Sequence, residues 1–374
     1  FFPSVALAWD ITEEPFFKNL NLKNVNLLKL RGSYGQTGTE SGVNRFGYLS
    51  TYSLAENAIC IGGNLQSGFN EGALVSPELL SWYTRNSLNY GIDVAFFNHR
   101  LKGSADYFFY VTKGGLVSPA DRYVVPLGTA LPQIKSENEH RREGFEASLR
   151  WDDKIGSDFY YEVGTNMTYY NNLYVKNQGE ALSDLKNPYK RSTHQTDYYG
   201  IMYMDNGLYQ TPEQVLGVPR RLQSSATKLG DIAYEDINGD GKIDGEDQVR
   251  WGMPSAPHFT YGFDFVLGYK GFTLSGLLYG TGKRNMEFGV TTKKNEAIWV
   301  LNDYQLDYWR EDNRDATFPR ISLEALPNGS NNQAASTFWV KNASFLRLKN
   351  LTLEYDFKYK LLRNVKWLST CRAN

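Results

Sequence analysis

The chain has 374 residues, of which 41% are hydrophobic and 22% charged, so it is neither a disordered nor a collagen-like sequence. Its formal net charge of -1 supplies no positive field for holding a polyanion, which argues against a nucleic-acid partner. The 2 Cys and 4 His residues form no motif together, which excludes a disulfide scaffold and a Cys/His zinc site.

Aromatic residues make up 15% of the chain and Gly contributes 34 residues, a combination that favours strands and turns. No apolar run approaches the roughly 18 residues of a transmembrane helix, although a barrel strand needs only every second residue to be apolar. The sequence begins Phe1-Phe2-Pro3 without a signal peptide and stops at Asn374 in mid-pattern, so we expect an internal piece of a longer protein.

The first half of the chain contains the clearest period-2 pattern. Short strands are predicted over 5–10 and 28–35, and from Asn86 apolar and polar residues alternate strictly. After Asn98-His99-Arg100 the alternation resumes, which predicts a hairpin. Its apolar positions are Leu88, Tyr90, Ile92, Val94 and Phe96, then Leu101, Ala105, Tyr107, Phe109 and Val111.

Two further hairpins follow along the chain. One is predicted from 145–151 and 159–169, with its turn at Asp152-Asp153-Lys154. The other is predicted from 259–269 and 272–278, with its turn at Lys270-Gly271. The remaining strand candidates are 345–357 and 365–371.

The lengths of strands and connections favour a membrane barrel over a large soluble β protein. The strands have about ten or more residues, which matches a tilted strand that crosses a bilayer, whereas soluble strands average about five or six. Short connections alternate with long ones, as in barrels with short turns on one side and long loops on the other. The short connections are 11–25, 98–100, 153–157, 270 and 358–364, and the long ones are 36–80, 113–142, 171–257 and 282–344.

An acidic loop interrupts the third long connection. Residues 236–247 fit the pattern D-x-[DN]-x-[DN]-G-x5-acid, with oxygen-bearing residues at positions 1, 3, 5, 9 and 12 and Gly241 at the bend. This spacing can wrap hard oxygen ligands around one Ca²⁺ ion. The predicted ligands are Asp236, Asn238, Asp240, Lys242 through its carbonyl, Asp244 and Asp247.

The competing interpretation of this loop is a plain Asx/Gly turn with solvated carboxylates. The residues before the loop, 231–234, look like a strand, so the loop is not the helix-flanked hand of a calcium sensor. We therefore expect a structural ion that fastens a long loop.

No pattern in the sequence supports an enzyme. Glu311-Asp312, and Glu143 beside Arg141-Arg142, are interpreted as solvated loop charges. Gly280-Thr281-Gly282-Lys283 fails as a phosphate-binding loop because Leu277 stands where the first Gly belongs and Arg284 replaces Ser or Thr.

Several segments taken together resemble the SusC/RagA family of TonB-linked outer-membrane receptors, along essentially the whole chain. They occur in the family's order. They are Phe2-Pro3-Ser4-Val5-Ala6 to Trp9, 28–38, Glu78-Leu79-Leu80-Ser81-Trp82, 89–94 with Asp106-Tyr107, Glu143-Gly144-Phe145-Glu146, the acidic loop, 309–313 with Phe318-Pro319-Arg320, and 344–351.

The chain departs from the family pattern at three places. Tyr83 stands where the family usually has Glu, and Arg141-Arg142 replaces the customary Glu-Asn before Gly144. The segment after Lys366 no longer follows the pattern, as expected of a truncated or frame-shifted gene product.

The resemblance implies an all-β fold: part of an antiparallel transmembrane β-barrel, with about ten or more of roughly 22 strands and long extracellular loops. All of 1–374 would belong to this one barrel domain, without the plug and TonB box of the whole receptor. It also implies the outer membrane of a Gram-negative bacterium, contact with outer-membrane lipid, a SusD-like lipoprotein lid, TonB, and import of oligosaccharides or peptides.

Within such a barrel, Leu88 to Phe96 would face lipid in alternation, while Asn89 and Asp93 would face the lumen. Loop aromatics could stack on sugars, although we expect most of them to pack the loops. The alternative function is a soluble, calcium-stabilised β-rich glycan-binding module or glycoside hydrolase. The aromatic candidates are Tyr198, Tyr199, Tyr203, Tyr209, Trp299, Tyr304, Tyr308 and Trp309.

Overall fold

The computed structural model describes most of the chain, and all statements below concern the described residues. These are 2–39, 52–71, 83–117, 134–217, 227–288, 303–321, 331–362, 364–365 and 371–373.

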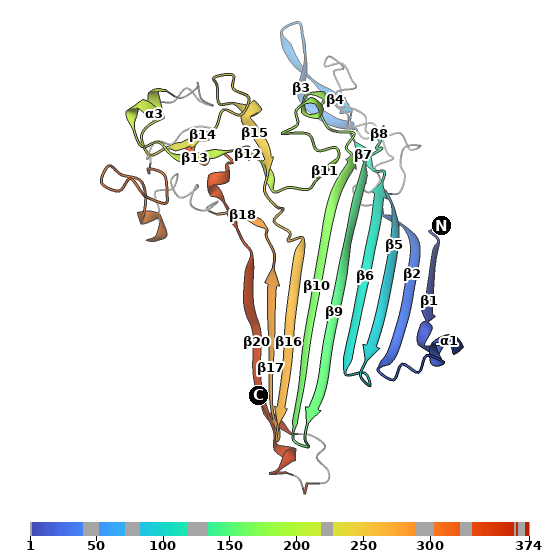
Figure 1. The fold of residues 1–374 in the computed structure, drawn as a ribbon. Coiled ribbons are helices and arrows are strands. Elements are labelled where there is room, and N and C mark those ends of the chain that lie inside the picture. Colours follow the sequence, from blue (N-terminus) through green and yellow to red (C-terminus); the bar gives the residue numbers. More distant parts are fainter. Residues whose placement is uncertain are drawn as a thin grey trace.

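One antiparallel 11-stranded sheet, here called the barrel wall, dominates the structure (Figure 1). Its strands follow one another in chain order across the sheet, and β11 (Gln195–Thr196) pairs beside the upper end of β10. The other members are β1 (Ser4–Asp10), β2 (Val25–Thr39), β5 (Tyr83–Phe96), β6 (Leu101–Lys113), β9 (Glu139–Ile155), β10 (Phe159–Lys176), β16 (Phe259–Tyr269), β17 (Phe272–Thr281), β20 (Phe345–Asp356) and β21 (Arg372–Ala373).

Short strands and helices occupy the connections. The strands pair as β3 (Tyr52–Ile61) with β4 (Asn64–Glu71), β7 (Leu116–Val117) with β8 (Ile134–Lys135), β12 (Gly200–Tyr203) with β15 (Gln248–Trp251), β13 (Asp205–Leu208) with β14 (Ile232–Tyr234), and β18 (Asn285–Glu287) with β19 (Val340–Asn342). The α-helices are α1 (Pro15–Lys18), α2 (Leu182–Lys186) and α3 (Pro212–Leu216).

All three predicted hairpins are present, with one turn displaced. Lys270 and Gly271 connect β16 to β17 with positive φ angles of 48° and 85°, which is the backbone of a tight hairpin turn. The second hairpin turns at 156–158 because Asp152 and Asp153 still belong to β9 and pair with β10. The predicted strand over 365–371 lies largely outside the described residues.

Short and long connections leave the barrel wall at opposite ends (Figure 1). The turns 97–100, 156–158 and 270–271 lie at the lower end in this view. The described parts of 177–258 and 282–344 lie at the upper end, where they form a separate group of strands and turns. The long strands of the wall therefore run between a turn end and a loop end.

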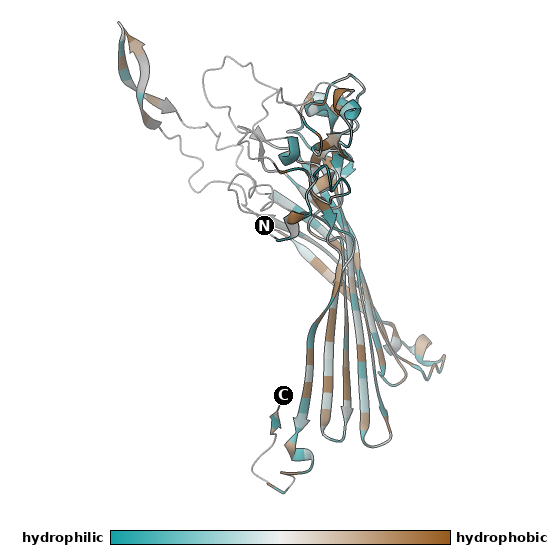
Figure 2. Cartoon of the chain, turned by 90° about the vertical axis from the view of Figure 1, so that its left-hand side faces the viewer, coloured by the Kyte–Doolittle hydropathy of each residue, from teal (hydrophilic) through white to brown (hydrophobic). Residues whose placement is uncertain are grey.

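Side chains alternate between two faces of the wall, and the register extends each face across neighbouring strands. Leu30, Ile92, Ala105 and Ala147 are aligned on the first face, which we call the apolar face. Its large side chains remain exposed, including Leu7 at 77% and Leu351 at 56%. Figure 2 shows the resulting alternation of apolar and polar bands along the strands. Such a surface is unfavourable in water and favourable in hydrocarbon.

The opposite, polar face carries ion pairs. Arg31 contacts Asp93 at 2.8 Å and Asp106 at 3.0 Å, joining three neighbouring strands. Arg150 contacts Asp264 at 3.0 Å and also Glu162. A soluble sandwich would bury its apolar rows and solvate the other face, so this arrangement supports the predicted partial barrel with a watery lumen.

The upper loops contain a conventional hydrophobic core. Tyr203, Ile232, Tyr234, Ile243 and Trp339 are at most 6% exposed and pack together, although they come from two separate connections. We call the parts of 177–258 and 282–344 that surround this core the loop assembly. A parallel bridge between Tyr203 and Ser336 and the pairing of β18 with β19 tie it together.

Within the described ranges, no helix combines the length and the apolar character needed to cross a bilayer.

Candidate binding site on the polar face

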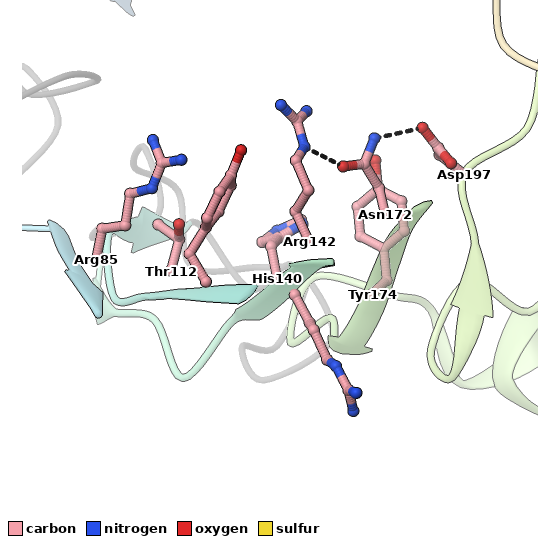
Figure 3. A pocket seen from close by; sticks show the side chains of 9 residues that line it. Arg85, Thr112, His140, Arg142, Asn172, Tyr174 and Asp197 are labelled. Carbon is pink, nitrogen blue, oxygen red and sulfur yellow. Dashed lines mark hydrogen bonds between the residues drawn. The ribbon is translucent and has the colours of Figure 1, made fainter. Parts of the chain in front are cut away.

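A pocket of about 300 Å³ lies on the polar face near the loop ends of the strands. It draws side chains from four neighbouring strands of the wall and one from the segment after β11 (Figure 3). The lining residues are Arg85, Tyr110, Thr112, His140, Arg141, Arg142, Asn172, Tyr174 and Asp197.

The strand register explains why residues so far apart in sequence meet here. Thr112 pairs with Arg85 on one side and His140 on the other, forming one row across the sheet. Two residues nearer the turn end, on the same face, Arg142 pairs with Tyr110 and with Asn172. Because these positions share the inward phase of the alternation, their side chains project into the same space.

Two guanidinium groups flank one tyrosine ring. The Arg85 guanidinium carbon lies 3.6 Å from the centre of the Tyr110 ring, and that of Arg142 lies 5.9 Å from it. Arg142 also lies 4.7 Å from the centre of the Tyr170 ring. A guanidinium within about 6 Å of an aromatic ring is attracted to it, which holds these two cations in fixed positions.

A chain of polar contacts positions Arg142 from the other side. Its Nε donates to Asn172 Oδ1, and Asn172 Nδ2 donates to Asp197 Oδ2 at 2.6 Å. Asp197 Oδ1 lies 3.0 Å from Nε2 of the buried His258. Burial by itself would raise the pKa of the Asp197 carboxyl, but the contacts with His258 and Asn172 outweigh it and keep this pKa below its ordinary value.

Neither Arg85 nor Arg142 has a carboxylate partner among the described residues. Arg31 and Arg150, on the same face, each contact two carboxylates. In the pocket, Asp197 is the one carboxylate among the lining residues, and it is engaged by His258 and Asn172. The site therefore presents two oriented forks of N–H donors with spare capacity, which is suited to an anionic group.

The pocket lies near the loop ends of strands that are longer than a bilayer crossing requires. β9 and β10 have 17 and 18 residues, whereas a tilted strand needs about 9–11 residues to cross the bilayer. Arg142 and Asn172 lie near the loop ends of these strands. A solute descending between the loops would meet them before it reached the membrane-spanning part of the wall.

The acidic loop folds as a series of turns held by its own side chains. Asp236 accepts hydrogen bonds from the amides of Gly239 at 2.7 Å and Gly241 at 2.9 Å. Asn238 accepts one from Asp240, and Asp240 one from Lys242. These are the contacts expected of Asx turns.

Asp247 closes the acidic loop from inside. Its side chain is fully buried and accepts from the amides of Ile237 at 2.9 Å and Asp244 at 2.8 Å, so it joins the two ends of the loop. Asp244 caps the short helix Gly245–Asp247. In the described part of the chain, no three His, Cys, Asp or Glu side chains converge on a point that could hold a metal ion. The donor chemistry of the predicted ligands, oxygen throughout, is that preferred by Ca²⁺.

Several aromatic candidates for substrate contact prove to be packing residues. Tyr203, Tyr209 and Trp309 are at most 7% exposed, inside the loop assembly. This agrees with the expectation that most loop aromatics pack the loops. Among the others, Tyr198 lies beneath Arg250, Tyr199 accepts from the amide of Glu287, and Tyr308 lies beneath Arg310. Trp299 and the side chain of Tyr304 lie outside the described residues.

The interpretation of Glu143 as a loop charge was wrong. Glu143 and Arg141 lie within β9, on its outward phase, and form an ion pair with each other. The pattern missed this because β9 begins at Glu139, before the apolar alternation starts at Phe145. The other proposed loop charges, Glu311 and Asp312, do lie in a turn.

Sequence patterns also missed most of the pocket. Arg85, Tyr110 and Asn172 fall on the polar phase of strands, where nothing distinguishes them from ordinary lumen residues. Asp197 and His258 are 61 positions apart, so no local spacing could connect them. The one signal was Arg142, because the pair Arg141-Arg142 departs from the family pattern.

Comparisons with known proteins agree with this fold. No protein-family model matches the chain. The chain is 25% identical to the TonB-dependent receptor P26 of Formosa agariphila over 95% of its length, and this match covers 35% of the receptor. It is 26% identical to the TonB-dependent receptor SusC of Bacteroides thetaiotaomicron over 96% of its length and 34% of that protein.

Solved structures with the same fold include the RagAB peptide importer in its open-open state. The TM-score is 0.71 at 19% identity, with 99% of this chain and 38% of that chain covered. The closed-closed state gives a TM-score of 0.68 over the same shares. The chain thus spans about a third of the length of its relatives, and the resemblance identified from the sequence is confirmed.

Proposed function

We propose that this chain, a segment of a SusC/RagA-type TonB-dependent receptor, forms part of the wall and outer vestibule through which nutrient oligomers enter the cell. Receptors of this type belong to the outer membrane of Gram-negative bacteria. The role is transport, and the proposal assigns no catalytic step to any residue of the chain.

The two-faced barrel wall is the observation that carries this proposal. One face exposes rows of large apolar side chains, and the other carries ion pairs across three or more strands. Such a wall is stable where lipid covers one side and water fills the other. The same exposed rows argue against the soluble glycan-binding module or hydrolase, whose apolar side chains would be buried.

We propose oligosaccharides as the first substrate class and peptides as the second. Oligosaccharides fit the polar and aromatic side chains that line the pocket, such as Tyr110, Thr112 and Tyr174. Peptides are favoured by the likeness to the RagAB peptide importer and by the charged pocket. In either case the substrate would be handed over by a SusD-like lipoprotein lid, and transport would be energised by TonB.

Uptake by intact cells tests the proposed function. The receptor gene that contains this segment would be deleted in its host, and uptake of labelled oligosaccharides and of labelled peptides would be measured. We expect one class to enter only when both the gene and TonB are present, and the product to require detergent for extraction. Extraction of the product into plain buffer, or uptake that is indifferent to TonB, would overturn the proposal.

We propose that the acidic loop binds one structural Ca²⁺ ion through Asp236, Asn238, Asp240, the Lys242 carbonyl, Asp244 and Asp247. The spacing and the oxygen-only donors support this, and so does the position of the loop against the core of the loop assembly, where Ile243 is buried. The ion would fasten residues 236–247 to that core, with the side chains turning from their amide partners toward the metal.

Calorimetric titration of the complete receptor with Ca²⁺ tests this site. Asp240→Ala should weaken Ca²⁺ binding by about ten-fold or more, because it removes one charged ligand. Glu246→Gln is the matched control, since Glu246 lies in the same loop outside the ligand pattern and should leave binding unchanged. Identical titration curves for wild type and Asp240→Ala would refute the calcium proposal.

A further inference from the structure

We infer that the pocket around Arg85 and Arg142 binds a carboxylate group carried by the transported oligomer. The inference rests on the proposed transport function and adds the chemistry of the cargo to it. The source of the carboxylate is either a uronic acid of an oligosaccharide or an acidic group of a peptide, and the experiment below separates the two.

The first argument is unused donor capacity. The Nε atom of Arg85 is buried and has no hydrogen-bond partner, although a buried donor without a partner is costly. Arg142 uses Nε for Asn172, and no carboxylate of the described residues contacts its terminal nitrogens. An incoming carboxylate would supply acceptors to both guanidinium groups.

The second argument is orientation. Figure 3 shows the Arg85 and Arg142 side chains extending to the same side of the strands, with Arg142 hydrogen-bonded to Asn172 and Asn172 to Asp197. The ring of Tyr110 between them restrains both cations through their cation–π contacts. A pre-arranged pair of planar forks matches the planar geometry of a carboxylate.

The third argument concerns charge balance on this face. Asp197 contacts Asn172 at 2.6 Å and His258 at 3.0 Å, and neither Arg85 nor Arg142 forms an ion pair with it. Thr112 and Tyr174 contribute neutral polar groups to the lining. The pocket therefore keeps an excess of positive charge, whereas Arg31 and Arg150 nearer the turn end are neutralised by their partners.

Binding to the complete receptor with its lid tests the inference. The probes are an oligogalacturonate, the same oligomer with its carboxyls methyl-esterified, a glutamate-containing peptide, and its glutamine counterpart. Wild type should prefer the acidic member of one pair, and that pair names the source of the carboxylate. Arg85→Gln and Arg142→Gln should each weaken binding of that acidic member by about ten-fold or more, and hardly affect its neutral partner.

Two further variants separate recognition from structure. Arg142→Lys keeps the charge but loses the fork, so it should restore part of the affinity lost in Arg142→Gln. Arg347→Gln removes an inward-phase arginine of β20, remote from the pocket, and should change neither member of a pair.

The outcomes are distinguishable from a failure of the transport proposal. Equal binding of acidic and neutral probes by wild type, or equal losses for both in Arg85→Gln and Arg142→Gln, would overturn carboxylate recognition. TonB-dependent uptake of neutral oligomers would leave the transport function standing in that event. A strong dependence of the acidic preference on ionic strength would agree with the inference, because exposed charges are screened by salt.

Discussion

The barrel wall and the loop assembly handle apolar side chains in opposite ways. In the wall, residues such as Leu7 and Leu351 point outward and remain exposed, while charged residues pair on the inner side. In the loop assembly, Ile232 and Trp339 are at most 2% exposed and polar groups cover them. One chain therefore contains a part that requires lipid and a part built like a small water-soluble domain.

The difference follows from what surrounds each part. A strand that crosses hydrocarbon satisfies its backbone through its neighbours and needs no core behind it. Loops that rise into water gain stability only by burying apolar area among themselves. The two long connections supply that area jointly, since Tyr203 and Trp339 come from different connections. Changes in one region should therefore leave the other intact.

Trp339→Ala should produce the largest difference in stability between the loop assembly and the barrel wall. Trp339 is 2% exposed and its Nε1 donates to the carbonyl of Asn332, so its loss should destabilise the loop assembly by about 3–5 kcal/mol. Protease added to intact cells should then cleave the loops while the wall stays folded in the membrane. Leu216→Ala, an exposed position in the same assembly, should behave as wild type. Collapse of the whole receptor would contradict the independence of the two regions.

A charge on the apolar face should produce the next largest effect. Leu149→Arg should destabilise the wall by about 2–4 kcal/mol, because Leu149 belongs to the rows that face hydrocarbon. Ser148→Arg places the same side chain one residue away on the polar face and should be tolerated. Urea titrations of the receptor in bilayers measure both, and equal losses would contradict the assignment of faces.

Acid should have the smallest effect, and it should be confined to the loop assembly. Glu180 accepts hydrogen bonds from the amide and hydroxyl of Thr193, and although burial would raise the pKa of its carboxyl, these contacts keep it below the ordinary 4.5. The pKa of Asp197 is likewise below 3.8. Because folding lowers the pKa of both carboxyls, their stabilising effect is complete at a pH above the ordinary pKa values. It is lost as the pH falls through the lower pKa values of the folded protein.

Hydrogen exchange as a function of pH checks this expectation. Corrected for the intrinsic rate, protection of the described residues of 177–258 should fall as the pH drops below the ordinary carboxyl values, while β9 and β10 stay protected. Glu180→Gln should make the protection of this region depend less on pH. A loss of protection that rises with pH instead would show that the sign has been assigned wrongly.

The wall could be predicted from the sequence because a period of two is a local property. The turns at Asn98 and at Lys270-Gly271 follow from the residues that interrupt the alternation, and the strands around them were predicted closely. The register shift between Leu277 and Leu278 in the pairing of β17 with β20 was not predicted, although the apolar positions of β20 change from even to odd numbers there.

The loop assembly and the pocket could not be predicted in the same way. The strands β12 and β15 pair across an interval of more than forty residues, and neither shows a long alternation. The pocket depends on which strands are neighbours and on side chains such as Asn172 that link Arg142 to a loop carboxylate. Those are tertiary relations, and only the spacing of the acidic loop was visible in the chain itself.

The most direct test of the central claim is the accessibility of alternate residues along β9 in a bilayer. With Cys60 and Cys371 replaced by Ser, single cysteines at positions 145–151 would carry spin labels, and collisions with oxygen and with a water-soluble nickel complex would be compared. The account predicts that labels at odd positions meet oxygen in lipid and labels at even positions meet the nickel complex. Accessibility that fails to alternate from one residue to the next would contradict it.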